Sequence, residues 1–207
     1  TLFRSADTSD RAYQFSDDVQ DLASNPDVEG TSKVINEDLT AKDGYVNAND
    51  NNIKGAMYEL RLANGKLSNR LEGDATLKLS FEPDADFDSL SSDEVSDIAD
   101  ELEVPESQVR DELEYRSPDD PNPEFDGFAI ENDGKAVYYE AKSGDVSTRD
   151  INGKLARLRA YQMTNNDVDS SQLRLNSLEP KSSDKVTNRV WEFLNDKEFG
   201  NAEQFEW

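Results

Sequence analysis

Apolar residues recur at two different spacings along this chain, and the spacings predict which segments are helices and which are strands. Residues 51–71, "NNIKGAMYELRLANGKLSNRL", carry apolar side chains at helical spacing and predict the first long helix. Residues 75–82, "ATLKLSFE", alternate apolar and polar positions and predict a strand. Residues 91–115 then predict two short acidic helices, because Ser91 and Glu94 form a capping box and Pro105 can start the second helix.

The second half of the chain predicts two more strands and two more helices, in a regular order. Strands are expected at 124–131, "EFDGFAIE", and 135–144, "KAVYYEAKSG", joined by a turn at residues 132–134. A helix is expected from about residue 150 to 163, a strand at 171–180 and a last helix at 183–196. The order predicts an α/β fold with a central mixed sheet flanked by helices.

The domain boundaries follow from where apolar anchors are dense. Residues 1–50 are polar and predict a partly ordered lead-in, with a short helix near Asp17–Ala23. Residues 51–200 predict one domain, in which 82–123 form an acidic helical insertion after the first strand. The negative charge of the insertion argues against DNA contact. The insertion could be a lid, a partner-binding surface or a solvated appendage, of which the last is the favoured interpretation.

Composition narrows the chemistry that the chain can perform. With 46 acidic and 22 basic residues the net charge is −24, which is typical of proteins from salt-loving organisms, where salt screens self-repulsion. The chain has neither histidine nor cysteine, which excludes Ser-His-Asp and Cys-His nucleophile systems, His/Cys zinc sites and disulfides. A metal would have to be one that prefers oxygen ligands, such as Mg²⁺ or Mn²⁺. No run of about 18 apolar residues is present, so no membrane span is expected.

One short stretch carries unusual charges. In "YYEAKSG" Glu140 and Lys142 are two positions apart and so share one face of the predicted strand. A two-residue turn would put Asp126 opposite Ala141, on the other face, whereas a three-residue loop with a left-handed Gly134 would put Asp126 opposite Glu140. The sequence Asn-Asp-Gly suits the three-residue loop. Two carboxylates and a lysine at one strand end fit a divalent cation and an activated water.

A third carboxylate could come from the first helix. Glu59 lies between Ala56 and Ala63 at helical spacing, at the margin of the apolar stripe, so small neighbours would let it approach the sheet. Taken alone, a glutamate in this position is more often a solvent-facing residue.

These residues in this order of elements resemble the PD-(D/E)XK nuclease superfamily, over about residues 51–180. The resemblance implies a restriction-endonuclease-like αβββαβ core in which Asp126, Glu140 and Glu59 hold the metal and Lys142 orients the attacking water. Family members often carry a glutamine or lysine on the next helix, and Gln162 is the candidate here, with a merely polar helix-end residue as the equal alternative. Phe125 stands where the motif has proline, a position that varies in the family.

Local charge offers a separate indication of substrate. Residues 52–70 and 149–162 each contain four basic residues against one acidic, a net of +3 in a chain of −24. Both segments are predicted helices beside the site, and phosphate binding requires such positive charge. Tyr161 could stack on a base. The expected nucleic-acid contacts are Lys54, Arg61, Lys66, Arg149, Lys154, Arg157 and Tyr161.

The sequence thus predicts a metal-dependent nuclease acting on DNA or RNA. The segment 43–63 most resembles the entry to nuclease domains of contact-dependent or polymorphic toxins, and a start at Thr1 suits a C-terminal effector module with an immunity protein as partner. Such an effector would act in a target cytoplasm. The alternatives are an intracellular resolvase or restriction-type nuclease, cytoplasmic in a halophile, and a non-catalytic nucleic-acid or protein binding module that retains the fold.

Overall fold

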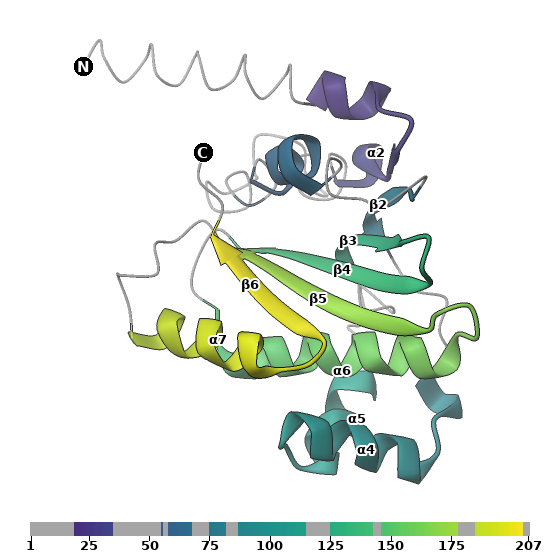
Figure 1. Cartoon of the computed structure of the whole chain (residues 1–207), viewed down its shortest axis with the longest axis vertical. Helices are drawn as coiled ribbons and strands as arrows, with labels where there is room; N and C mark the ends of the chain where they lie inside the picture. Colours follow the sequence, from purple (N-terminus) through teal and green to yellow (C-terminus); the bar gives the residue numbers. More distant parts are fainter. Residues whose placement is uncertain are drawn as a thin grey trace, which may run out of the picture.

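The computed structural model describes residues 19–34, 55, 58–67, 75–81, 87–114, 125–142, 146–177 and 185–204. Its centre is a six-stranded mixed sheet in the order β1-β2-β3-β4-β5-β6 (Figure 1). The strands β2, β3 and β4 are antiparallel neighbours, and β1–β2, β4–β5 and β5–β6 are parallel pairs. Their bounds are β1 Val28–Glu29, β2 Leu77–Phe81, β3 Phe125–Ile130, β4 Lys135–Lys142, β5 Ser170–Ser177 and β6 Gly200–Gln204.

Helices cover both faces of this sheet, which confirms the expected mixed α/β architecture. One face, here the α6 face, packs against α6 and α7, with α4 and α5 packed on α6 in turn, and carries Phe128, Tyr138 and Leu173. The opposite face, here the N-terminal face, packs Val137 and Tyr139 against helical residues 58–62 and the π-helix that follows. The helices are α2 Thr31–Val34, the π-helix η3 Ala63–Leu67, the 3₁₀-helix η5 Phe87–Ser89, α4 Ser92–Leu102, α5 Glu106–Glu114, α6 Thr148–Thr164 and α7 Lys185–Asp196.

The β3–β4 hairpin has the three-residue loop that the sequence favours. The Glu131 N–H donates to the Lys135 carbonyl at 2.9 Å, and Gly134, between them, has φ of +80°. Gly127 pairs with Tyr139 in the resulting register, so the next position along places Asp126 opposite Glu140. The register prediction is confirmed, and it decides which side chains can meet.

The acidic helical pair, α4 and α5, is better integrated than the sequence suggests. The capping box of Ser91 and Glu94 is present, and α5 begins immediately after Pro105 as expected. However, Ile98 and Leu102 lie in the same buried cluster as Leu155 and Leu158 of α6. The favoured interpretation of a merely solvated insertion is therefore wrong, because the apolar stripe of each helix is part of the main core.

Two segments at the chain ends extend the sheet. Residues 19–24 are helical, in agreement with the expected short helix, and Val28 of β1 pairs with Leu77, so part of the lead-in belongs to the domain. Leu22 and Val34 are fully buried. The sixth strand, β6, was not expected, because "GNAEQ" has none of the β-branched or aromatic residues that mark strands. In the described part of the chain, no helix is long and apolar enough to cross a bilayer.

Candidate active site

A buried carboxylate at the carboxyl end of β4 is the centre of the candidate site. Tyr138, Glu140 and Lys142 alternate along β4 and point to the α6 face, where Glu140 is fully buried. The Glu140 carboxylate pairs with the Lys142 ammonium and accepts a hydrogen bond from the Tyr138 hydroxyl. The Lys154 ammonium, from the second turn of α6, lies 3.3 Å from Glu140 Oε2. A buried charge needs such partners, since desolvation alone would be costly.

Asp126 joins this group from the neighbouring strand. Its Oδ2 accepts a hydrogen bond of 2.9 Å from the Ala141 backbone N–H, between Glu140 and Lys142. The structure therefore brings Asp126, Glu140 and Lys142 together as the sequence predicted. These three residues, with Tyr138 and Lys154, are called the carboxylate–lysine cluster below.

The two carboxylates of the cluster have opposite pKa shifts. Burial and the negative charge of Glu140 raise the pKa of Asp126 to about 7, although Lys142 and Lys154 oppose the shift. Burial also acts to raise the pKa of Glu140, but the ammonium groups of Lys154 and Lys142 and the donated hydrogen bonds lower it to about 2. For Lys142, burial is outweighed by the carboxylates of Glu140 and Asp126, which raise its pKa. Near neutral pH, Glu140 is ionised and Asp126 is poised between its two forms.

The cluster has the ligand types that a hard divalent cation prefers. Asp126 and Glu140 supply carboxylate oxygens on neighbouring strands, and the Ala141 N–H holds the Asp126 carboxylate beside Glu140. Burial and, after it, repulsion from Glu140 raise the pKa of Asp126, and a bound cation would relieve this repulsion. The residues present therefore fit Mg²⁺ or Mn²⁺.

Glu59 is not placed with them. Its helix packs against Val137 and Tyr139 on the N-terminal face, whereas the cluster lies on the α6 face. Within the described residues, no group of three or more acidic side chains is arranged to hold a metal. The structure thus does not assemble the expected ligand set with Glu59 as its third carboxylate, because helical spacing identifies the buried side of a helix but not the sheet face that it covers.

Gln162 is also displaced from the cluster. Helix α6 connects the end of β4 to the start of the parallel strand β5, so its first turns lie near Glu140 and its last turns lie at the other end of the sheet. There Gln162 accepts hydrogen bonds from Arg159 at 2.5 Å and Ser171 at 2.7 Å. Lys154 occupies the place beside the carboxylates that was expected for Gln162.

The sequence did not identify Tyr138 as a site residue, and it assigned Lys154 to substrate contact alone. The Lys154 ammonium lies 5.8 Å from the centre of the Tyr138 ring as well as beside Glu140. The sequence did contain a signal for this role of Lys154. Lys154 lies in the first half of the predicted helix, eight residues before Gln162, and the start of this helix is near the end of the preceding strand, where Glu140 lies.

The basic residues expected on α6 are partly neutralised by ion pairs. Arg157 pairs with Glu112 at 3.5 Å, and Arg159 forms a two-pronged pair with Glu101 at 2.6 and 2.9 Å, so both serve to dock the helical pair on α6. Tyr161 is 5% exposed and packs edge-on against Phe128, which excludes base stacking in this conformation.

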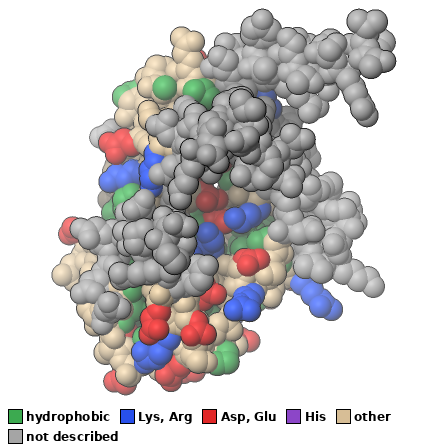
Figure 2. All heavy atoms as spheres, turned by 180° about the vertical axis from the view of Figure 1, so that it is seen from behind, with side chains coloured by type: hydrophobic (Ala, Val, Ile, Leu, Met, Phe, Trp, Pro, Cys, Tyr) green, Lys and Arg blue, Asp and Glu red, His purple; other side chains and the backbone are tan. Residues whose placement is uncertain are grey.

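The remaining predicted contacts are dispersed. Arg149 is exposed at the start of α6. Arg61 is half-buried in the helix on the N-terminal face. Lys54 and the side chain of Lys66 lie outside the described residues. On the face seen in Figure 2, basic and acidic side chains are interspersed, and no continuous basic patch is visible among the coloured residues.

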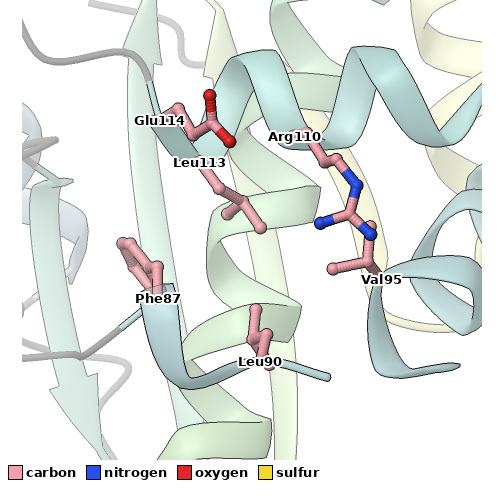
Figure 3. A pocket seen from close by; sticks show the side chains of 6 residues that line it. All are labelled: Phe87, Leu90, Val95, Arg110, Leu113 and Glu114. Atoms are coloured by element: carbon pink, nitrogen blue, oxygen red, sulfur yellow. The ribbon is translucent and has the colours of Figure 1, made fainter. Parts of the chain in front are cut away.

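Two cavities lie around the helical pair. A smaller one, of about 110 Å³, lies between η5, α4 and α5 and is lined mainly by Phe87, Leu90, Val95 and Leu113, with Arg110 and Glu114 at its polar side (Figure 3). It shares no residue with the carboxylate–lysine cluster. A larger one, of about 320 Å³, lies between α5 and the first turns of α6 and includes Lys154. The larger cavity therefore adjoins the candidate site.

Comparison of the chain with protein-family models, with curated proteins and with solved structures finds no match.

Proposed function

We propose that the protein is a metal-dependent nuclease that hydrolyses phosphodiester bonds of DNA or RNA. The observation that supports this proposal is the convergence of Asp126, Glu140 and Lys142 at the end of the β3–β4 hairpin. The strand order and the restriction-endonuclease-like core expected from sequence are compatible with the mixed sheet and belong to the same proposal.

Each residue of the cluster has a role in this reaction. Asp126 and Glu140, with the Ala141 carbonyl, would hold Mg²⁺ or Mn²⁺, which supplies charge stabilisation at the phosphate and a more acidic water. Lys142 orients the attacking water and offsets charge that develops on the phosphate oxygens. The water oxygen bonds to phosphorus and releases a proton to solvent, the bond to the leaving nucleotide oxygen breaks, and that oxygen takes a proton from a solvent water. Tyr138 and Lys154 fix the Glu140 carboxylate in place.

The test is cleavage of plasmid DNA and total tRNA in concentrated salt with Mg²⁺ or Mn²⁺, compared with EDTA. Glu140→Gln and Lys142→Ala should each reduce cleavage at least about a hundredfold, because each removes a group that acts in the transition state. Both variants should melt below the wild type, since each loses one partner of a buried ion pair, so circular dichroism must show that they are folded at the assay temperature. Glu131→Gln is the matched control, because Glu131 is another buried glutamate paired with a lysine, at the far end of the same hairpin. If Glu131→Gln also lost cleavage, the losses in Glu140→Gln and Lys142→Ala would be due to impaired folding and not to a missing catalytic group.

A second candidate is a non-catalytic binding module with the same fold. It is favoured by the self-neutralisation of the cluster, in which both Glu140 oxygens face an ammonium group. Absence of metal-dependent cleavage on every substrate, together with measurable nucleic-acid binding, would select this candidate.

The biological form of the proposed nuclease is a toxin effector module with a cognate immunity protein. The alternative form is an intracellular resolvase- or restriction-type enzyme. Expression of the wild type and of Glu140→Gln inside a host cell distinguishes them, because only an effector should arrest growth through cleavage of host nucleic acid and be neutralised by a co-expressed partner.

A further inference from the structure

The larger cavity, between α5 and the first turns of α6, combines both signs of charge. Its volume is about 320 Å³. Its basic lining residues are Arg149, Lys154 and Arg157, and its acidic ones are Asp111, Glu112 and Asp150. Three basic and three acidic residues therefore line one hollow, in a chain in which acidic residues outnumber basic ones by 46 to 22. An anion that enters this hollow meets three basic residues close together.

The cavity is continuous with the proposed catalytic cluster through one residue. Lys154 lines the cavity and also lies 3.3 Å from Glu140 Oε2. A group bound in the cavity would therefore lie beside a residue that contacts the carboxylates.

Glu112 already presents an anion to this cavity. Its carboxylate lies 3.5 Å from the Arg157 guanidinium, whose Nε–H also donates to the Glu112 carbonyl at 3.3 Å. The approach is close because of Gly153, where an added Cβ would lie only 2.6 Å from Glu112 Oε2. The glycine lets α5 bring a carboxylate against the first turns of α6.

We propose that this cavity binds a backbone phosphate of the nucleic-acid substrate, and that Glu112 is a built-in competitor for its cations. The inference rests on the proposed function and names the substrate subsite. Carboxylate and phosphate oxygens suit the same guanidinium geometry, so a phosphate bound to Arg149 and Lys154 would also recruit Arg157 from Glu112. The helical pair thereby controls the affinity for the substrate through Glu112, which competes with the phosphate for Arg157.

The test measures binding without cleavage. A fluorescein-labelled single-stranded oligonucleotide is titrated with protein in EDTA, and anisotropy gives the dissociation constant. Glu112→Gln should bind at least about threefold more tightly than the wild type, because Arg157 is released to the phosphate. Arg149→Gln should bind about threefold more weakly and, being an exposed position, should fold normally.

Glu101→Gln is the matched control. It makes the same charge change on the same helical pair and also removes an ion pair with α6, to Arg159, but outside this cavity. Equal gains for Glu112→Gln and Glu101→Gln, or an unchanged Arg149→Gln, would overturn the inference. A gain specific to Glu112→Gln in a protein that never cleaves with metal would refute the nuclease proposal alone. Metal-dependent cleavage without that specific gain would refute the subsite alone.

Discussion

Asp126 and Glu140 face each other across one hairpin, yet they titrate on opposite sides of their ordinary range. Glu140 has two ammonium neighbours and a phenol donor, so its charged form is stabilised despite complete burial. Asp126 has one backbone N–H donor in the cluster and a negative neighbour, so its neutral form is favoured. Both carboxylates are buried, so the difference between their pKa values comes from their different partners.

The first prediction follows from Asp126 and concerns the metal-free protein. The pKa of Asp126 is about 7 in the fold against 3.8 ordinarily, so between these values the folded state holds a proton that the unfolded state has lost. Folding stability from this group is therefore present at low pH and is lost as pH rises from about 4 to 7. Glu140, with its lowered pKa, contributes the opposite slope only below its ordinary value of 4.5.

Asp126→Asn should remove the loss of folding stability that the ionisation of Asp126 causes as pH rises. Relative to wild type, the variant should gain roughly 3 kcal/mol of unfolding free energy between about pH 4.5 and pH 7.5. Urea unfolding in EDTA at several pH values measures this. Asp133→Asn, in the exposed loop of the same hairpin, is the control and should follow the wild type. A constant difference between Asp126→Asn and wild type over the whole window would contradict the prediction.

At the scale of residues, the sequence predicted the acid pair and the strand lysine but not their full surroundings. Alternation along a strand and the composition of a turn are local, and they were sufficient for Asp126, Glu140 and Lys142. The distances of Gln162 and Lys154 from the site depend on the direction in which α6 runs along the sheet. Helical periodicity does not show this direction. Arg157 pairs with Glu112, which lies 45 residues away in the sequence, so a local pattern could not predict this ion pair.

At the scale of elements, the hairpin loop fixes the register on which the candidate site depends. Gly134→Ala should destabilise the fold by about 1–3 kcal/mol, because φ is +80° there and a Cβ would lie 2.8 Å from Asp169 Oδ2. Cleavage should fall with it, since an altered loop would turn Asp126 away from Glu140. Gly65→Ala is the control, because no described residue outside its own helix places a heavy atom within 4 Å of the new Cβ. Denaturation curves showing equal effects for both substitutions would refute the role assigned to the loop.

The helical pair offers a second prediction at this scale. Ile98→Ala should cost about 2–5 kcal/mol of stability for the whole domain, because Ile98 is fully buried in the core cluster shared with α6. Unfolding is followed by tryptophan fluorescence, to which Trp191, buried in α7 and outside the helical pair, contributes. Ile130→Ala, at a 37% exposed isoleucine, should cost under about 1 kcal/mol. An unchanged fluorescence transition in Ile98→Ala would mean that the pair unfolds independently.

Elements with strong periodic patterns were predictable, and their placement was less so. Helices α4, α6 and α7 and strands β2 to β5 lie close to the expected ranges. The weakly patterned β6 was missed, and the helix with Glu59 was expected beside the site although it covers the other face. Amphipathic spacing shows that a helix has a buried side, but the face of the sheet that it covers is decided by long-range packing.

At the scale of the whole molecule, some of the acidic side chains pair with basic side chains between helices and so help to hold the fold together. The acidic helical pair neutralises Arg157 and Arg159 of α6, so one of the two basic segments is used largely for internal docking. Few cations therefore remain near the site to attract a polyanion over long distances, in a protein of net charge −24. Substrate binding must depend on short-range contacts.

The last prediction, on salt, follows from this balance. Most nucleic-acid binding weakens steeply with salt because it is driven by counterion release. Here low salt leaves the protein repelling both itself and the substrate backbone, whereas near 1 M salt that repulsion is screened beyond ~3 Å and direct contacts of metal, lysine and arginine persist. Cleavage, with divalent metal always required, should therefore be retained or rise as monovalent salt approaches molar concentration. Single-turnover cleavage during a salt titration, with circular dichroism to monitor folding, measures this. A maximum near ~0.1 M salt, followed by loss of cleavage while the fold persists, would show that short-range contacts do not dominate.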